Sequence, residues 1–335
     1  MSDPTAAEVP TKRMSFGQAT VDATRRAMLD DEGVIILGED ITWGGSFGQF
    51  RGLTEEFGPE RVIDTPISEA LIVSAAVGAA LTGMRPMASM QFVEFTLGAM
   101  DEVVNQAAKM RYMSGGQANV PMVLRASDGV LRSSAAQHSG SIEALFTHIA
   151  GLKVVAPSNP ADAKGLLRTA IDDDDPVVFL ENKAITPSRG PVPEGDHRVP
   201  LGSAAVAAPG TDVTLVTYSV MTVHGHAAVA RLADEHGISA ELVDLRSLWP
   251  LDFDTIAESV GRTGRAVVAH EAWRTGGYGA EISARIAEEL FAELRGPVVR
   301  VGARRAPIPF APTLEPAVVP AVDDLVDAVV RACDA

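Results

Sequence analysis

Short apolar runs alternate with longer small-residue or amphipathic stretches along the first half of the chain. The run at 34–37, Val-Ile-Ile-Leu, is apolar throughout, which is typical of a strand buried on both faces. The stretch 70–81 predicts a helix almost free of bulky side chains, so another backbone can approach it closely. An apolar stripe at 101–113, followed by a Ser-Gly-Gly stop, predicts an amphipathic helix.

The same alternation continues to the end of the chain. In the first half it predicts strands at 120–124, 153–156 and 177–180, helices at 141–149 and 160–171, and a loop at 126–137. In the second half it predicts strands at 212–218, 239–245, 265–270 and 297–302, with helices at 222–236, 252–261, 279–294 and 321–333. Strands separated by helix-length segments indicate an α/β fold with parallel sheets covered by helices on both faces.

A segment rich in proline and glycine divides this pattern in two. It spans 187–200 and is the clearest linker in the chain, because the alternation of strands and helices restarts beyond it. The length of 335 residues also exceeds what one hydrophobic core usually fills. We therefore predict a flexible N-terminus at 1–13, a first domain at 14–186 and a second α/β domain at 201–335.

Composition and charge exclude several classes of protein. Hydrophobic residues make up 46% and charged residues 21%, which rules out a disordered chain. The 44 acidic residues outnumber the 28 basic ones, and the net charge of −16 disfavours nucleic acid and anionic membranes as partners. The chain has neither a signal peptide nor an apolar run of the roughly 18 residues that a membrane span needs. A single cysteine, Cys333, favours a reducing, cytoplasmic compartment.

The segment 64–69, Asp-Thr-Pro-Ile-Ser-Glu, directly precedes the small-residue helix and has two interpretations. It is a helix start if Thr65 or Ser68 caps the helix and Glu69 interacts with the positive end of its dipole. Alternatively, the Glu69 carboxyl lies in an apolar wall and shares a proton with a bound heterocycle. The spacing of the residues does not separate the two.

One of the seven histidines stands out by its position. His138 lies in a loop of small residues just before a predicted helix, and loops on a rigid scaffold often carry function. A buried structural histidine is the competing interpretation. No pair of histidines has zinc-ligand spacing supported by a third ligand, so a zinc site is not expected.

Four aspartates at 172–175 close the predicted helix that begins at Pro160. Carboxylates at the negative end of a helix dipole are disfavoured by about 0.3–1 kcal/mol each where they are exposed. A solvated turn accommodates this cost, and so does a bound cation with carbonyl and carboxylate ligands. Both interpretations stay open.

Motifs that hold phosphate groups are absent. The chain has no Walker-type loop and no Gly-x-Gly-x-x-Gly opening a helix after a strand. Ser127-Asp128-Gly129 comes nearest to the Gly-Asp-Gly motif that anchors a magnesium diphosphate, but its first glycine is missing. This chain alone therefore offers no diphosphate cradle.

Several ordered motifs resemble the beta subunits of thiamine-diphosphate-dependent 2-oxo acid dehydrogenases, the E1 beta family. They are 64–69 (DTPISE), 105–112 (NQAAKMRY), 136–139 (AQHS), 151–155 (GLKVV), 162–166 (DAKGL), 270–271 (HE) and 276–279 (GGYG). The likeness runs from about residue 14 to 330. The segments 135–139 and 146–149 (FTHI) lean toward the pyruvate and acetoin dehydrogenase branch.

The resemblance implies a transketolase-like pyrimidine-binding domain followed by a transketolase C-terminal-like domain. It also implies an alpha subunit that holds Mg²⁺ and the diphosphate, which accounts for the missing cradle. Glu69 matches the family glutamate that hydrogen-bonds the aminopyrimidine ring, and Ile67, Gln91 and Phe95 match positions around that ring, although Phe95 is also compatible with a simple core role. His138 matches the family histidine near the reacting centre, which is expected to assist proton transfer.

The resemblance also implies a structural potassium site at the aspartate run. The matching positions are Met122, Ala170, Ile171, Asp173 and Asp175. Most of them would contribute carbonyl oxygens, with Asp173 as the carboxylate, and Asp175 is an asparagine in some relatives.

Departures from the family pattern lie beside His138. Relatives have a glycine-rich stretch where this chain has 128–134, Asp-Gly-Val-Leu-Arg-Ser-Ser, and Gly140 stands where glutamine is frequent. Residues 184–186, Ala-Ile-Thr, replace a common Leu-Tyr-Arg. The changes next to His138 affect the choice of substrate or acceptor more than the binding of the cofactor.

The leading hypothesis is the beta subunit of an α2β2 E1 enzyme that cleaves a pyruvate-like 2-oxo acid, or acetoin, and passes the acyl group to the lipoyl domain of an E2 acyltransferase. One alternative is a split transketolase or carboligase that transfers the carbanion to an aldehyde or ketone. Another is a non-catalytic docking subunit.

Overall fold

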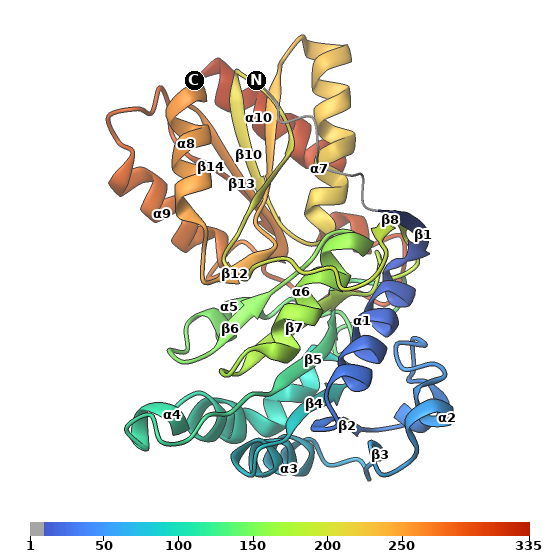
Figure 1. The fold of residues 1–335 in the computed structure, drawn as a ribbon. Helices are drawn as coiled ribbons and strands as arrows, with labels where there is room; N and C mark the ends of the chain where they lie inside the picture. Colours follow the sequence, from blue (N-terminus) through green and yellow to red (C-terminus); the bar gives the residue numbers. More distant parts are fainter. Residues whose placement is uncertain (1–9) are drawn as a thin grey trace.

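The computed structural model describes residues 10–335, and within them two α/β domains lie one above the other (Figure 1). The first sheet runs in the order β12 (Ser247–Trp249), β6 (Lys153–Val155), β7 (Val177–Asn182), β5 (Val123–Asp128), β4 (Arg85–Met90), β2 (Val34–Gly38) and β3 (Val62–Asp64). The second runs β14 (Val299–Ala303), β13 (Ala266–Trp273), β10 (Val213–Thr217), β11 (Ala240–Asp244) and β9 (Ala205–Ala208). Neighbouring strands are parallel except at the β12 and β9 edges, so the expected α/β fold is confirmed.

Helices cover both faces of each sheet. They are α1 (Phe16–Asp30), α2 (Leu53–Phe57), α3 (Glu69–Leu81), α4 (Met110–Met113), α5 (Glu143–Thr147), α6 (Pro160–Asp172), α7 (Val220–Arg231), α8 (Phe253–Thr263), α9 (Gly279–Glu289) and α10 (Val322–Asp334). Alternate residues of the strands point to opposite faces. Val34 and Ile36 join the cluster beneath α1 and α6, whereas Ile35 and Leu37 join the cluster beneath α3.

The two domains share one hydrophobic core. The cluster beneath α3 continues into the second domain through Val216 and Val243 and through the buried faces of α8 and α9. Strand β12, which follows the second domain's β11 in sequence, forms the edge of the first domain's sheet next to β6. A hydrophobic cluster and a β-sheet therefore both extend across the boundary between the two domains.

The two ends of the first domain pair with each other in a two-stranded sheet. Residues 1–9 of the expected flexible N-terminus lie outside the described residues. Strand β1 (Thr11–Ser15) pairs antiparallel with β8 (Arg189–Pro193), which lies inside the expected linker. Ser15 then starts α1 through a capping box, because its Oγ accepts from the Gln18 amide at 3.1 Å and Gln18 Oε1 accepts from the Ser15 amide at 2.9 Å. Residues 11–13 of the expected flexible N-terminus thus belong to a paired strand.

Two further elements depart from the sequence pattern. The helix expected at 101–113 divides into a π-helical turn, Glu102–Ala107, and the short α4. The division lies where Gly151 approaches so closely that a Cβ there would sit 2.0 Å from the Ala108 carbonyl oxygen. Strand β5 extends to Asp128, into the expected loop, because it pairs with β7 as far as Asn182. Within it, Arg125 is buried in an ion pair with Glu181. The buried charges hide this strand from a hydrophobic pattern.

Candidate active site

The residues singled out from the sequence follow the carboxyl ends of neighbouring parallel strands. Glu69 comes after β3, Gln91 directly after β4 and His138 in the loop after β5. Strand β2 lies between β3 and β4, so all these ends meet at one edge of the sheet. Ligands of open α/β sheets bind outside this edge.

Aromatic rings bring two of the expected residues together. The His138 ring meets Phe95 edge to face with centroids 5.6 Å apart, and it meets Phe92 in the same way at 4.6 Å. Phe92 and Phe95 also contact each other at 5.4 Å. Phe95 is only partly buried, so it contributes to a wall beside His138 rather than to the closed core. Phe92 is a member of this wall that the sequence analysis did not identify.

Glu69 begins α3 but takes no part in a side-chain cap. Neither Ser68 nor Thr65 caps the helix, and the Thr65 hydroxyl is buried with no hydrogen-bond partner among the described residues. The helix start itself is confirmed, with Glu69 in the first turn of α3, whereas the expected side-chain cap is absent. The Glu69 carboxylate lies over Gly98, where a Cβ would be 3.9 Å from Oε2, and it makes no hydrogen bond or ion pair within residues 10–335. The absent side chain at Gly98 leaves space beside the carboxylate.

Further acidic residues lie near Glu69 at the end of β2. The pKa of Glu39 is raised, first by burial and then by the carboxylates of Glu69 and Asp40. Gln91 lies beside this group, since its Oε1 accepts from the Ser46 hydroxyl and its Nε2 is 3.5 Å from Asp40 Oδ2. The site is therefore an acidic edge with one amide side chain.

Ile67 does not pack against the other expected residues. Its side chain is 81% exposed. Large apolar side chains on neighbouring segments are also about half exposed or more, namely Trp43, Leu71 and Leu97. Exposed apolar side chains gathered around a site are typical of a surface that another molecule covers.

Glutamates of the second domain hold the loop that carries His138. Glu271 Oε2 accepts from the Val130 amide at 3.2 Å, from Ser141 Oγ at 3.1 Å and from Asn182 Nδ2 at 2.9 Å. Glu315 Oε1 accepts from the Ser133 amide at 2.7 Å. Both ends of the loop are thus tied to the second domain.

Backbone geometry in this loop is strained. Ser133 and Ala135 have φ of 61° and 60°, the left-handed region that favours glycine. These residues replace part of the glycine-rich stretch expected in relatives, and the Glu315 contact supports the strained backbone.

The unusual Gly140 has a local explanation. Its amide donates to a Glu94 carboxylate oxygen, and a Cβ at residue 140 would lie 2.8 Å from the same oxygen. Glu94 therefore fills the space that a glutamine side chain would need. The wall on this side of His138 is acidic in this chain.

Comparison with known proteins places the whole chain in one group. Residues 12–188 match the transketolase pyrimidine binding domain, and residues 202–325 match the transketolase C-terminal domain. The beta subunit of acetoin:2,6-dichlorophenolindophenol oxidoreductase from Cupriavidus necator is 46% identical over 92% of this chain and 94% of the relative. The pyruvate dehydrogenase E1 component subunit beta of Rickettsia felis is 42% identical over 96% of this chain and 98% of the relative.

The chain belongs to the family of 2-oxo acid dehydrogenase E1 beta subunits. Its transketolase-type domains place it among the thiamine-diphosphate-dependent enzymes. Another relative is the 2-oxoisovalerate dehydrogenase subunit beta of Pseudomonas aeruginosa, 43% identical over 89% of both chains. Among solved structures, one titled split gene transketolase, inactive beta4 tetramer, matches with a TM-score of 0.77 and 26% identity, over 96% of this chain and 98% of that one.

Buried charges beside the His138 loop of this E1 beta chain were missed by the sequence analysis. Burial raises the pKa of Asp128 well above its usual value and lowers the pKa of Lys183. Glu143 is buried with its carboxylate on the Tyr218 hydroxyl of the second domain. Asp128 is the last residue of β5 and Lys183 follows β7 directly, so polar residues at the ends of buried strands were the signal that could have identified them.

The histidine–glycine motif of the second domain has a packing role. His270 is fully buried, its Nδ1 lies 3.1 Å from the Ala272 carbonyl oxygen, and burial lowers its pKa to about 4. A Cβ at Gly277 or Gly279 would lie within 2.5 Å of the His270 ring. The glycines are therefore needed for the close approach of α9 to this ring.

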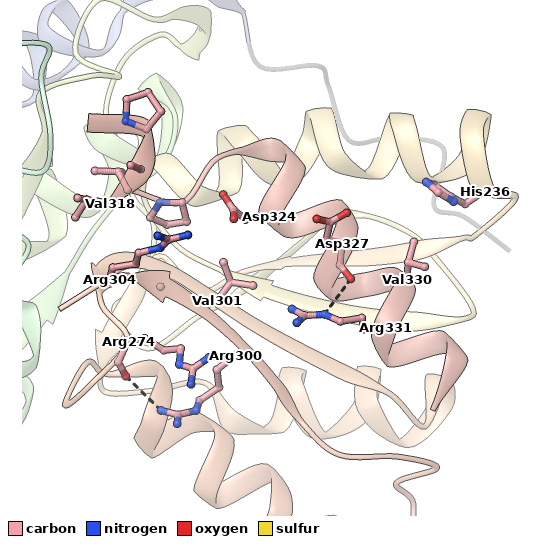
Figure 2. A pocket seen from close by; sticks show the side chains of 15 residues that line it. His236, Arg274, Arg300, Val301, Arg304, Val318, Asp324, Asp327, Val330 and Arg331 are labelled. Carbon is pink, nitrogen blue, oxygen red and sulfur yellow. Dashed lines mark hydrogen bonds between the residues drawn. The ribbon is translucent and has the colours of Figure 1, made fainter. Parts of the chain in front are cut away.

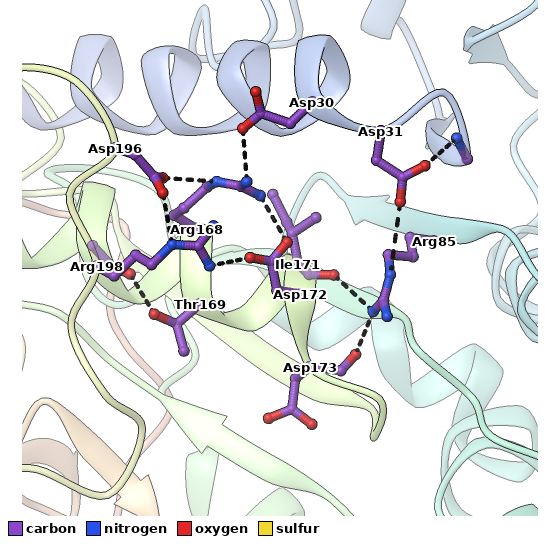
Figure 3. A network of polar contacts seen from close by, with 12 residues as sticks. Asp30, Asp31, Arg85, Arg168, Thr169, Ile171, Asp172, Asp173, Asp196 and Arg198 are labelled. Atoms are coloured by element: carbon purple, nitrogen blue, oxygen red, sulfur yellow. Dashed lines mark hydrogen bonds and ion pairs between the residues drawn. The ribbon is translucent and has the colours of Figure 1, made fainter.

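Several oxygens of the expected potassium site contact arginine or lysine side chains. The carbonyl oxygens of Ile171 and Asp173 accept from Arg85 Nη1 at 3.3 and 3.0 Å (Figure 3). The Asp173 carboxylate accepts from Lys153 Nζ at 2.7 Å, and Asp175 pairs with Arg111 at 2.6 Å. Protein cations thus supply positive charge at the oxygens of Ile171, Asp173 and Asp175. The Met122 carbonyl oxygen accepts from the Val177 amide at 3.0 Å.

A separate cavity of about 600 Å³ lies in the second domain, beside α10. Figure 2 shows the side chains of Arg274, Arg300, Arg304 and Arg331 around it, with Asp324 and Asp327 on the helix. None of the residues expected at the active site lines this cavity.

Within the described residues, no helix is long and apolar enough to cross a membrane.

Proposed function

We propose that this E1 beta chain supplies the pyrimidine half of a thiamine diphosphate site in an α2β2 enzyme. Glu69 carries the proposal, because its carboxylate lies at the strand-end edge without a partner among the described residues and beside the open space at Gly98. The missing diphosphate cradle supports the assignment of Mg²⁺ and the diphosphate to an alpha-type subunit. The exposed Ile67 fits a surface that this subunit covers.

The residues present fit the aminopyrimidine ring. Glu69 would share a proton with a ring nitrogen, Gln91 would hydrogen-bond the ring, and Phe95 would stack against it. When bound, the cofactor supplies an electron sink for cleaving the bond next to a carbonyl group. His138, held between Phe92 and Phe95, would transfer a proton at the acceptor atom as the acyl group leaves.

The reaction that we propose is cleavage of a pyruvate-like 2-oxo acid or of acetoin, with transfer of the acyl group to a lipoyl domain of an E2 acyltransferase. The relatives named for acetoin and pyruvate support both substrates. Co-expression with an alpha-type subunit, followed by assay of pyruvate and acetoin with an artificial electron acceptor, tests the proposal. We expect turnover by the complex and none by the beta chain alone. Turnover by the lone chain would contradict the proposal. Unchanged turnover in complexes that carry Glu69→Ala or His138→Ala would also contradict it, and would support a non-catalytic docking subunit.

A second candidate is a split transketolase or carboligase that passes the carbanion to an aldehyde or ketone. The structural similarity to a split gene transketolase and the altered loop around Gly140 favour it. Product formation from two carbonyl compounds without a lipoyl domain would support this candidate. Dependence of product formation on a lipoyl domain would support the first.

A further inference from the structure

A basic cleft of about 780 Å³ opens beside the proposed active site. It lies where α1 meets the two-stranded β1–β8 sheet, on the right of the first domain in Figure 1, and the loops after β2, β5 and β7 contribute to it. Its cationic lining residues are Lys12, Arg13, Arg25, Arg51, Lys183 and Arg189. The cleft thus gathers six of the chain's 28 Lys and Arg residues but, in Asp22, only one of its 44 acidic residues. The chain has a net charge of −16, so the positive charge of this cleft is opposite in sign to the charge of the protein as a whole.

Most of these cations have no ion-pair partner among the described residues. Arg25 pairs with Glu56 at 2.6 Å, and Asp22 is already paired with Lys164 at 2.7 Å. Within the described residues, the remaining cations have no carboxylate within ion-pair distance. Like charges gathered in a cleft focus a positive potential, which favours an anionic partner.

The cleft reaches from solvent to the aromatic wall of the active site. Arg51 and Arg189 are exposed at its mouth, whereas Lys183 is only 3% exposed. The Lys183 ammonium has no hydrogen-bond partner among residues 10–335 and lies 5.3 Å from the centroid of the Phe92 ring. Phe92 in turn contacts the His138 ring. A negatively charged partner bound at the mouth of the cleft would therefore lie next to the reacting centre.

We propose that this cleft docks an acidic protein domain that carries the acyl acceptor to the His138 side of the site. The inference rests on the proposed function and adds the docking surface and the charge of the partner. An uncharged aldehyde or ketone acceptor needs no array of cations. The spread of unpaired charges from the exposed β1–β8 sheet to Lys183 matches a protein surface better than a single carboxylate.

The test compares two rates of the reconstituted complex. One is reduction of an artificial dye, which needs no carrier, and the other is acylation of a purified lipoyl domain of net negative charge. The double variant Arg51→Gln/Arg189→Gln should raise the KM for the lipoyl domain about tenfold at low salt, and it should leave dye reduction unchanged. Added NaCl should raise the wild-type KM toward that of the variant. Arg26→Gln, an exposed arginine of α1 that does not line the cleft, is the matched control and should change neither rate.

The outcomes separate the docking proposal from the proposed function. Dye reduction by the wild-type complex with an unchanged KM in the double variant would overturn the docking proposal alone. An equal change in Arg26→Gln would also overturn it, because the effect would then follow overall charge. Absence of dye reduction would contradict the proposed function. In that case, calorimetric titration of the full chain with the lipoyl domain would still test docking, and equal affinity of wild type and double variant would refute it.

Discussion

Two acidic clusters in this chain have opposite surroundings. At the ends of β2 and β3, Glu39 and Glu69 have no ion pair among the described residues, and their mutual repulsion contributes to the raised pKa of Glu39. At the end of α6, each aspartate from Asp172 to Asp175 pairs with an arginine or lysine. The second cluster is the more conspicuous in the sequence, yet its charge is neutralised within the protein.

The difference teaches where to look for a ligand. Paired carboxylates at the end of α6 anchor α1, α6 and the linker to one another, as Figure 3 shows around Arg168. Unpaired carboxylates at a strand-end edge are unfavourable in the protein alone and become favourable when a bound group hydrogen-bonds them. Pairing, and not the number of acidic residues, therefore separates the structural cluster from the proposed cofactor site.

The largest expected effect is that of Glu69→Gln on activity. If Glu69 shares a proton with the cofactor, the substitution should lower the turnover of the reconstituted complex by about 10²–10⁴-fold. The free energy of unfolding should change by less than about 0.5 kcal/mol, because Glu69 has no partner to lose among the described residues. Asp174→Asn, in the paired cluster, is the control and should leave turnover unchanged. If Glu69→Gln retained more than a tenth of the wild-type turnover, the proposed role of Glu69 in proton sharing would be contradicted.

The next effect concerns stability. Arg168 is buried and contacts Asp30 at 2.8 Å, Asp172 at 2.7 Å and Asp196 at 3.1 Å. Arg168→Met should lower the free energy of unfolding by about 2–4 kcal/mol, because it leaves these carboxylates facing one another. Arg198→Met removes a more exposed partner of two of these aspartates, Asp172 and Asp196, and should cost less than about 1 kcal/mol. Denaturant titration of both variants measures this, and equal losses would show that burial of Arg168 is not the cause.

A third prediction concerns potassium. Because Arg85 and Lys153 already contact the expected ligand oxygens, wild-type stability should be the same in KCl and NaCl at equal ionic strength. A cation bound at 100 times its dissociation constant would instead add about 2.7 kcal/mol. Arg85→Met should cost about 1 kcal/mol in either salt. A melting temperature raised by K⁺ alone would restore the cation site that the resemblance implied.

Strongly patterned parts of the fold were predictable from the sequence. The apolar runs of β2 and β7 and the small-residue stretch of α3 gave the α/β class, because their patterns reflect burial directly. Helix α1 was not identified, since its buried face consists largely of alanine and threonine. The pairing of β12 with β6 was also out of reach, because it joins segments almost a hundred residues apart.

The candidate site shows the same division. Glu69 and His138 are marked by local motifs and Phe95 by the family resemblance, and the structure places them at one edge. Glu271 was quoted only as part of a motif, because its partners Val130 and Asn182 lie more than 80 residues away. Local sequence thus indicates which residues face the site, whereas the contacts that hold them require the tertiary structure.

The smallest expected effect is the pH dependence caused by Glu39. Its raised pKa means that the folded protein favours the protonated carboxyl group, so ionisation reduces stability as pH rises through the folded pKa. Glu39→Gln should therefore stabilise the protein at pH 8, by a few tenths of a kcal/mol because solvent screens this partly exposed group. The gain should vanish below the unfolded pKa of about 4.3, where both states are protonated. Urea titrations at pH 8 and pH 4 measure the difference. A gain of equal size at both pH values would show that packing, and not repulsion from Glu69 and Asp40, sets Glu39 apart from the paired aspartates.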